Sequence, residues 1–354
     1  MSPEITPNTF LTCTSTSTGS NPIQPPETTI FFISGNPGLI GYYHPFLSLL
    51  SKYLTPENEN DNGNDQPSFQ IYGCSLGGFE LNDEKNPSSH ERKVQKTQSD
   101  DWDLDLDLED QIRFVQGKLT TLMRISPITT GSKQKVILIG HSVGAYIAME
   151  ILRRHREASP GEGRDFDIIG GAMLFPTVID IAASASGRKL TTLLSIIPRF
   201  AAVVGFFARL LTLLLPASIL RALVRFVMND PPSHALDATC SFLRSSGGVR
   251  QALHMAADEM RTITSDKWSD DVWGAATARE PLTKLFFYFG GKDHWVADQT
   301  RDEIIAVRGR KEGQGPTMLV CEEELPHAFC LKHSDIMARK TAGMIKQIVG
   351  WEST

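Results

Sequence analysis

Apolar runs recur along the chain, and each ends at Gly, Pro or a polar residue. They span residues 29–33, 69–75, 136–139, 168–175, 284–289 and 317–321. Most of them lack polar alternation, which is typical of strands that are buried on both faces. Residues with apolar side chains at helical spacing lie between or after these runs, at 42–54, 108–123, 143–154 and 334–348. This order predicts an α/β fold with a mostly parallel central sheet flanked by helices.

Polar stretches interrupt the pattern. Residues 1–28 are rich in Ser, Thr, Pro and Asn and predict a loose N-terminal segment with a short edge strand around 10–14. This segment has no positively charged start and no apolar run, so we do not expect a secretory signal. The low-complexity stretch 55–68 and the charged stretch 81–99 predict surface insertions.

The apolar segment 190–228, within residues 181–280, predicts a helical cap inserted into the core. Helical pieces are expected at 190–198, 200–208, 210–215, 219–228 and 247–263. Prolines divide the apolar part at 198 and 216, and no charge-free run approaches the ~20 residues of a membrane-spanning helix. We therefore divide the chain into the N-terminal segment 1–28, a core formed by 29–180 and 281–354, and the cap 181–280.

The last apolar piece of the cap has the pattern of a basic amphipathic helix. Ser218, Arg221 and Arg225 share one face. The rest is covered by Ile219, Leu220, Leu223, Phe226 and Val227. This pattern is typical of a helix that lies in a lipid interface. The alternative interpretation is a hydrophobic lid over an active-site cleft. The two interpretations are compatible.

The run 135–139 leads directly into Gly140-His-Ser-Val-Gly144, and a helical pattern follows. Strand, G-x-S-x-G and helix in this order indicate a nucleophile elbow, which exposes its serine on a sharp turn. The turn strains the serine backbone, so its neighbours must lack side chains, as Gly140 and Gly144 do. Ser142 is therefore the predicted nucleophile. The alternative is a Gly-rich helix start with an idle serine.

A second glycine-rich turn, Ser34-Gly-Asn-Pro-Gly38, follows the first predicted strand. In folds with a nucleophile elbow, a loop at this place supplies one half of the oxyanion hole. We predict that the backbone amides of Asn36 and Val143 form that hole, since developing negative charge needs preorganised donors. A simple β-turn is the alternative for the Gly35–Gly38 motif.

Serine-based acyl transfer needs a histidine base and a carboxylate that orients it, in the chain order Ser, Asp or Glu, His. Asp293 and His327 each follow a predicted strand and have this order relative to Ser142. Asp180 and Asp298 are alternative carboxylates. The alternative histidines are His333, His141 and His294, of which His141 should point away from the nucleophile.

Composition narrows the function further. The net charge of −6, with 21% charged residues, provides no basic field, so we expect no nucleic-acid partner. The five cysteines are scattered without C-x-x-C spacing, which suits reduced thiols in a cytosolic protein. The Asp-Leu run at 101–110 precedes a predicted helix and favours an acidic helix cap over a metal site. Nothing in the sequence calls for a metal or organic cofactor.

Motifs from about Ile30 to the C-terminus match one known family. They are Ser34–Gly38, Tyr42–Phe46, Gly140–Tyr146, Leu174–Val178, Asp258–Arg261, Gly290–Trp295 and His327–Phe329. Together they resemble the lipid droplet-associated hydrolase family of α/β-hydrolases. The resemblance implies an α/β-hydrolase fold and places the family's serine, aspartate and histidine on Ser142, Asp293 and His327. One departure is Ser184-Ala-Ser-Gly187, where the family usually has a Ser-Pro-Asn-Gly turn.

What the resemblance implies is a serine esterase or lipase-like enzyme on lipid droplets, with a cytosolic or endoplasmic reticulum pool. Its role would be neutral lipid or sterol ester turnover or storage, and residues 190–228 would contact the droplet surface or a membrane interface. Two other functions stay open on the sequence. One is a non-catalytic droplet scaffold or remodelling protein, and the other is a soluble esterase for small molecules.

Overall fold

The computed structural model describes residues 3–14, 26–55, 67–81, 105–125, 133–158, 166–197, 199–275, 282–309 and 314–351. The insertions predicted at 55–68 and 81–99 lie almost entirely outside the described residues. The described residues form one eight-stranded sheet in the order β1-β2-β4-β3-β5-β6-β7-β8. Its strands are β1 (Glu4–Ile5), β2 (Thr9–Cys13), β3 (Thr28–Ile33), β4 (Phe69–Cys74), β5 (Gln134–His141), β6 (Phe166–Leu174), β7 (Lys284–Phe289) and β8 (Thr317–Val320).

The sheet is parallel from β4 to β8, and β1 and β2 extend it antiparallel at one edge. β2 coincides with the strand expected around 10–14. It is not the edge strand that was predicted, because β1 pairs with it and forms the edge of the sheet. All residues of β3 are buried, as are the last six of β5. These strands therefore have helices on both faces, as the uninterrupted apolar runs predicted.

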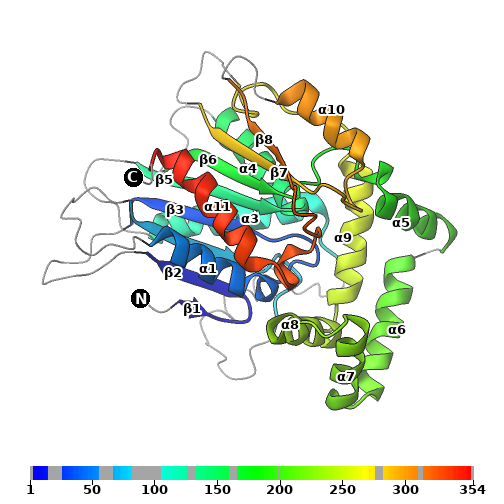
Figure 1. Ribbon diagram of the computed structural model, residues 1–354. Coiled ribbons are helices and arrows are strands. Elements are labelled where there is room, and N and C mark those ends of the chain that lie inside the picture. The colour runs from blue at the N-terminus through cyan, green and yellow to red at the C-terminus, as the bar shows by residue number, and fades with distance from the viewer. Residues whose placement is uncertain are drawn as a thin grey trace, which may run out of the picture.

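Helices cover both faces of the sheet (Figure 1). α1 (His44–Leu54) and α11 (Ser334–Val349) pack together on one face, and α3 (Leu108–Ile125) and α4 (Val143–Glu157) lie on the other. The acidic residues before α3 cap it: the backbone N–H of Asp110 donates to Asp107 Oδ1 at 2.9 Å. Within the described residues, no cluster of His, Cys, Asp and Glu side chains is arranged to hold a metal ion.

The cap lies beside the carboxyl ends of the parallel strands (Figure 1). It contains η2 (Ile181–Ala183), α5 (Ala185–Ile196), α6 (Phe200–Leu214), α7 (Ala217–Val227), α8 (Ser233–Arg244) and α9 (Gly248–Thr262). The pieces expected at 200–208 and 210–215 form the single helix α6, because the charged Arg209 between them points outward without breaking the backbone pattern. α8 was not predicted, and neither was α10 (Asp298–Arg308) in the core.

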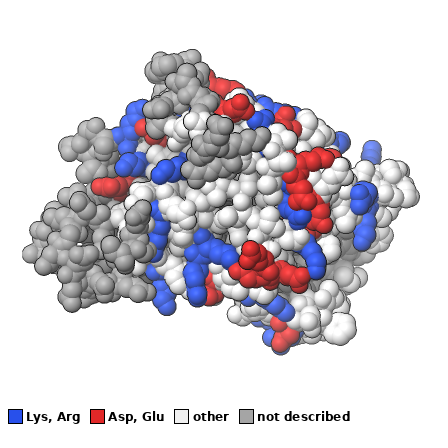
Figure 2. All heavy atoms as spheres, turned by 45° about the horizontal axis from the view of Figure 1, so that its top comes forward, with Lys and Arg blue, Asp and Glu red and all other residues white. Residues whose placement is uncertain are grey.

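Among the described helices, none is by itself long and apolar enough to cross a membrane. α5 and α6 reach that length and composition only as a pair, and the two helices meet at an angle of 93°. On the face drawn in Figure 2, acidic and basic side chains lie interspersed. That face therefore has no field of one sign, in keeping with the small net charge.

Candidate active site

The elbow positions Ser142 between β5 and α4. Ser142 has φ 56° and ψ −125°, a strained conformation for a residue with a side chain. A Cβ atom on Gly140 would lie 2.4 Å from the carbonyl oxygen of Gly144, and one on Gly144 would lie 2.3 Å from that of Ile33. Both glycines are thus required by close backbone approach, which is the role the sequence assigned to them.

His327 lies between Ser142 and Asp293. Its Nε2 is 2.9 Å from Ser142 Oγ, and its Nδ1 is 2.7 Å from Asp293 Oδ2. Asp293 follows β7 and His327 follows β8, so parallel strands bring all three side chains to the same end of the sheet. The structure thereby brings together the three residues predicted as nucleophile, carboxylate and base.

The pKa of Asp293 determines where the protons lie in the hydrogen bonds that join Asp293, His327 and Ser142. Burial alone would raise the pKa of Asp293, but the hydrogen bond and charge of His327 and the amide of Trp295 lower it below the ordinary value. Asp293 is therefore a carboxylate that accepts from His327 Nδ1–H. Nε2 is then left as the acceptor for the hydroxyl of Ser142. The Asp293 side chain is 3% exposed and that of His327 is 14% exposed, so water competes little for these bonds.

The alternative residues lie elsewhere. Asp180 precedes η2, and Asp298 accepts from Arg301 at the start of α10. His333 precedes α11. In the part of the chain that the structure describes, Asp293 is the carboxylate hydrogen-bonded to His327.

Val143 directly follows Ser142, and Asn36 lies in a loop that contacts the elbow. Val143 is the first residue of α4, where backbone N–H groups have no acceptor within the helix and the helix dipole favours negative charge. Asn36 belongs to the loop after β3. This loop touches the elbow, since a Cβ atom on Gly35 would lie 2.9 Å from Ser142 Cβ.

Sequence reasoning missed a buried hydrogen-bonded chain beneath the site. His141 Nε2 is 3.0 Å from the carbonyl oxygen of His327, which can only accept, so Nε2 carries the proton. His141 Nδ1 therefore accepts from the hydroxyl of Tyr43 at 2.8 Å, and Tyr43 Oη accepts from the N–H of Gly35 at 3.2 Å. Burial and then the charge of His327 lower the pKa of His141 to about 3, so the ring stays neutral. The sequence signals for Tyr43 were its place soon after the Gly35–Gly38 turn and its inclusion in the Tyr42–Phe46 motif.

Comparison with known proteins identifies the family. The model of the family described as lipid-droplet associated hydrolase matches residues 26–330. The chain belongs to this family. Proteins named lipid droplet-associated hydrolase are similar to it. That of Pongo abelii is 28% identical over 92% of this chain and 86% of its own length, and that of Drosophila melanogaster is 26% identical over 90% and 89%.

Solved structures that are similar to this chain establish its fold. The haloalkane dehalogenase DbeA from Bradyrhizobium elkani superposes with a TM-score of 0.53 at 12% identity, covering 99% of both chains. A mutant of DBJA gives 0.53 at 13% identity, covering 99% of this chain and all of its own (100%). At such identities the similarity concerns the fold alone. The predicted α/β-hydrolase fold is thus confirmed.

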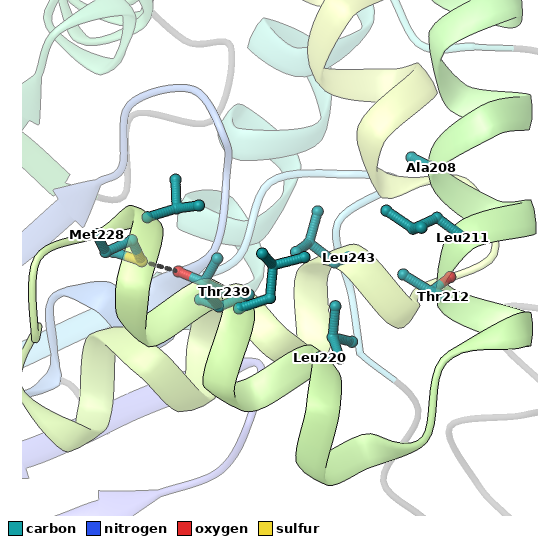
Figure 3. A pocket seen from close by; sticks show the side chains of 10 residues that line it. Ala208, Leu211, Thr212, Leu220, Met228, Thr239 and Leu243 are labelled. Atoms are coloured by element: carbon teal, nitrogen blue, oxygen red, sulfur yellow. Dashed lines mark hydrogen bonds between the residues drawn. The ribbon is translucent and has the colours of Figure 1, made fainter.

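The cap contains an apolar cavity whose lining residues do not include Ser142 (Figure 3). Its volume is about 190 Å³. Side chains from α6, α7 and α8 line it, including Leu211, Leu220 and Leu243, and the hydroxyl of Thr239 donates to Met228 Sδ at its wall. The cavity shows that the three helices leave apolar surface uncovered between them.

The outer side of α6 and α7 exposes large apolar side chains. We call the following residues the apolar cap surface: Phe206, Phe207, Leu213, Leu214, Phe226 and Val227. Phe226 is 84% exposed. The helical face predicted from the sequence needs one correction: Leu220, expected to face lipid, is 2% exposed and packs against Leu236 of α8. Arg221 and Arg225 are exposed and pair with Asp237 and Asp230.

Proposed function

We propose that this chain is a serine carboxylester hydrolase that acts on a neutral lipid or sterol ester at the lipid droplet surface, in lipid storage or turnover. The observation that carries the proposal is His327, which bridges Ser142 Oγ and Asp293 Oδ2 at 2.9 and 2.7 Å. Such a bridge makes a serine hydroxyl nucleophilic at neutral pH, because the imidazole removes its proton as the bond to carbon forms.

In the proposed reaction, Ser142 Oγ attacks the ester carbonyl carbon while His327 Nε2 takes the hydroxyl proton. His327 then gives this proton to the leaving alcohol, and an acyl-serine remains. A water molecule then attacks the acyl carbon while the same nitrogen takes its proton. This proton passes to Ser142 Oγ as the acyl–oxygen bond breaks and the carboxylic acid is released. Asp293 holds the imidazole in the required tautomer and stabilises its charged form. The backbone amides of Asn36 and Val143 bind the oxyanion of each tetrahedral intermediate.

The apolar cap surface supports the lipid part of the proposal. Large Phe, Leu and Val side chains are exposed on both α6 and α7, and exposed apolar side chains that gather on neighbouring helices mark interaction sites. Relatives of this chain carry lipid droplet association in their names. In the proposal, α6 and α7 dock on the droplet. Molecules that are not bound to droplets form a pool in the cytosol or at the endoplasmic reticulum.

An active-site fluorophosphonate tests the chemistry. Wild type, Ser142→Ala and the matched control Ser51→Ala on α1 are labelled with and without artificial droplets. We expect labelling of wild type and Ser51→Ala, none of Ser142→Ala, and faster labelling on droplets. An unlabelled, folded wild type that still binds droplets would favour a scaffold. Labelling that droplets never change would favour a soluble esterase.

A further inference from the structure

One buried carboxyl group does not belong to the hydrogen-bonded set Ser142, His327 and Asp293. Glu259, in the cap helix α9, is 6% exposed. A carboxyl group without bulk water is unfavourable unless it is hydrogen-bonded or neutral. Glu259 therefore needs a structural or functional reason to be buried where it is.

Its partner is the side chain of Asn36, the residue whose backbone amide is a candidate oxyanion donor. Asn36 Nδ2 donates to Glu259 Oε1 at 3.0 Å and to the carbonyl oxygen of Ala252 at 2.9 Å. The Ala252 carbonyl can only accept, so it fixes which end of the Asn36 amide faces α9. Both N–H groups of this amide are thus bound by one cap helix.

The loop that carries Asn36 is held from two sides. On the core side, the N–H of Gly35 donates to Tyr43 Oη at 3.2 Å. On the cap side, α9 binds the Asn36 side chain. The same loop approaches Ser142 closely, since a Cβ atom on Gly35 would be 2.9 Å from Ser142 Cβ. A small rotation of the Asn36 peptide would turn its N–H away from the oxyanion, so these contacts bear on catalysis.

α9 also packs along α6, which carries part of the apolar cap surface. The two helices approach closely at Gly205, where an added Cβ atom would lie 2.8 Å from Arg250 Cβ. One helix therefore touches both the surface-exposed apolar helix and the loop beside Ser142.

We propose that Glu259 is a positioning residue, which holds the oxyanion loop in its active geometry by binding the side chain of Asn36 and so links the cap to the site. This inference rests on the proposed function for its catalytic part. Glu259 itself touches no reacting atom.

The proton state of Glu259 agrees with this geometry. Burial, together with the nearby carboxylate of Asp258 and against the hydrogen bond from Asn36, raises the pKa of Glu259 to about 8. Below that pH the group is a neutral acceptor. Above it, a negative charge lies beside the loop that must stabilise an oxyanion, which disfavours the transition state.

The test compares Glu259→Ala, Glu259→Gln and the matched control Asp258→Asn. Asp258 is the next residue of α9, but it faces α3, where it accepts from the N–H of Leu108 at 3.0 Å. Ester hydrolysis and fluorophosphonate labelling are measured against pH. We expect kcat of Glu259→Ala to fall about 10- to 100-fold with little change in KM. Glu259→Gln keeps the acceptor, so it should match wild type at pH 7 and lose the fall in rate near pH 8. Asp258→Asn should keep wild-type kcat at pH 7, and its fall in rate should move only to a slightly lower pH, because it removes one charge that raises the pKa of Glu259.

A double-mutant cycle and hydrogen exchange complete the test. Asn36→Ala combined with Glu259→Ala should lose no more activity than the worse single variant, because the two side chains act as one unit. Amides 34–41 should exchange faster in Glu259→Ala than in Asp258→Asn. Additive losses, or wild-type kcat and exchange in both Glu259 variants, would overturn the inference. A wild type without any serine reactivity would sink the proposed function alone, and exchange would still decide whether Glu259 holds the loop.

Discussion

The hydroxyl of Tyr43 donates to His141 Nδ1 at 2.8 Å, and this one bond joins the two halves of the candidate site. Tyr43 accepts from the N–H of Gly35 on the oxyanion loop, and His141 donates to the backbone carbonyl of His327. The loop that would bind the oxyanion and the loop that carries the base are thereby held in register through a neutral, buried imidazole. The residue just before the nucleophile thus serves as a structural link.

Removing the Tyr43 hydroxyl should therefore disturb both loops. Tyr43→Phe leaves the Gly35 N–H and His141 Nδ1 without this partner in a buried place, and we expect a loss of about 1–3 kcal/mol in the free energy of unfolding. Urea titration measures this loss. Tyr53→Phe is the control, because the Tyr53 hydroxyl bonds Asp335 at the surface, and its stability should stay within about 0.5 kcal/mol of wild type. Equal stabilities of the two variants would contradict the link.

His141 should make the protein sensitive to acid. Its pKa is about 3 in the folded chain and 6.5 in the unfolded one, so between these values the unfolded chain binds the extra proton. Stability then falls as the pH falls from about 6.5 towards 3. His141→Gln removes this titration, so its urea midpoint should change less with pH over that range. Parallel curves for wild type and variant would show that His141 does not contribute.

Glu259 should have the opposite effect at higher pH. Its pKa is raised from 4.5 to about 8 on folding, so in that window the folded chain keeps a proton that the unfolded chain has released. Stability therefore decreases as the pH rises from about 4.5 to about 8. Relative to wild type, Glu259→Gln should gain stability between pH 5 and pH 9, as read from thermal unfolding. A constant difference across this range would refute the assigned shift.

Asp293 should affect turnover far more than stability. Asp293→Asn presents an amide that can donate to His327 Nδ1, which favours the tautomer with a proton on Nε2 and removes the acceptor for Ser142. We expect kcat to fall about 10⁴-fold. Asp298→Asn on α10 is the control and should retain wild-type kcat, since Asp298 contacts Arg301 at 2.9 Å. If the two variants had comparable kcat values, Asp293 would not be the carboxylate that orients His327, and Asp180 would be the remaining candidate.

The apolar cap surface should set the affinity for lipid. Phe226→Ser replaces a side chain that is 84% exposed, so the free energy of unfolding should hardly change, while droplet binding weakens about tenfold. Flotation with artificial droplets measures the binding. Leu220→Ala, in the same helix but buried against α8, should instead lower stability by about 2–5 kcal/mol. Unchanged flotation of Phe226→Ser and of the other five single variants of this surface would exclude it as the docking site.

Local pattern was enough to predict much of this protein from its sequence. Apolar runs indicated the parallel strands, because burial on both faces leaves no place for polar side chains. The elbow could be read from Gly140 and Gly144, since a Cβ atom at either would collide with backbone. Where the pattern was weak, prediction failed: α10 is largely polar and α8 lies in a segment without a strong apolar run, so neither was expected.

Only the tertiary structure decided which partners meet. Asn36 and Glu259 are 223 residues apart, and Tyr43 and His141 are 98 apart, so no local pattern records their contact. The choice of Asp293 over Asp180 likewise depends on where the loops after parallel strands end in space. Sequence periodicity reports which side of an element is buried, but a hydrogen bond depends on a few tenths of an ångström between elements, which packing of the whole chain determines.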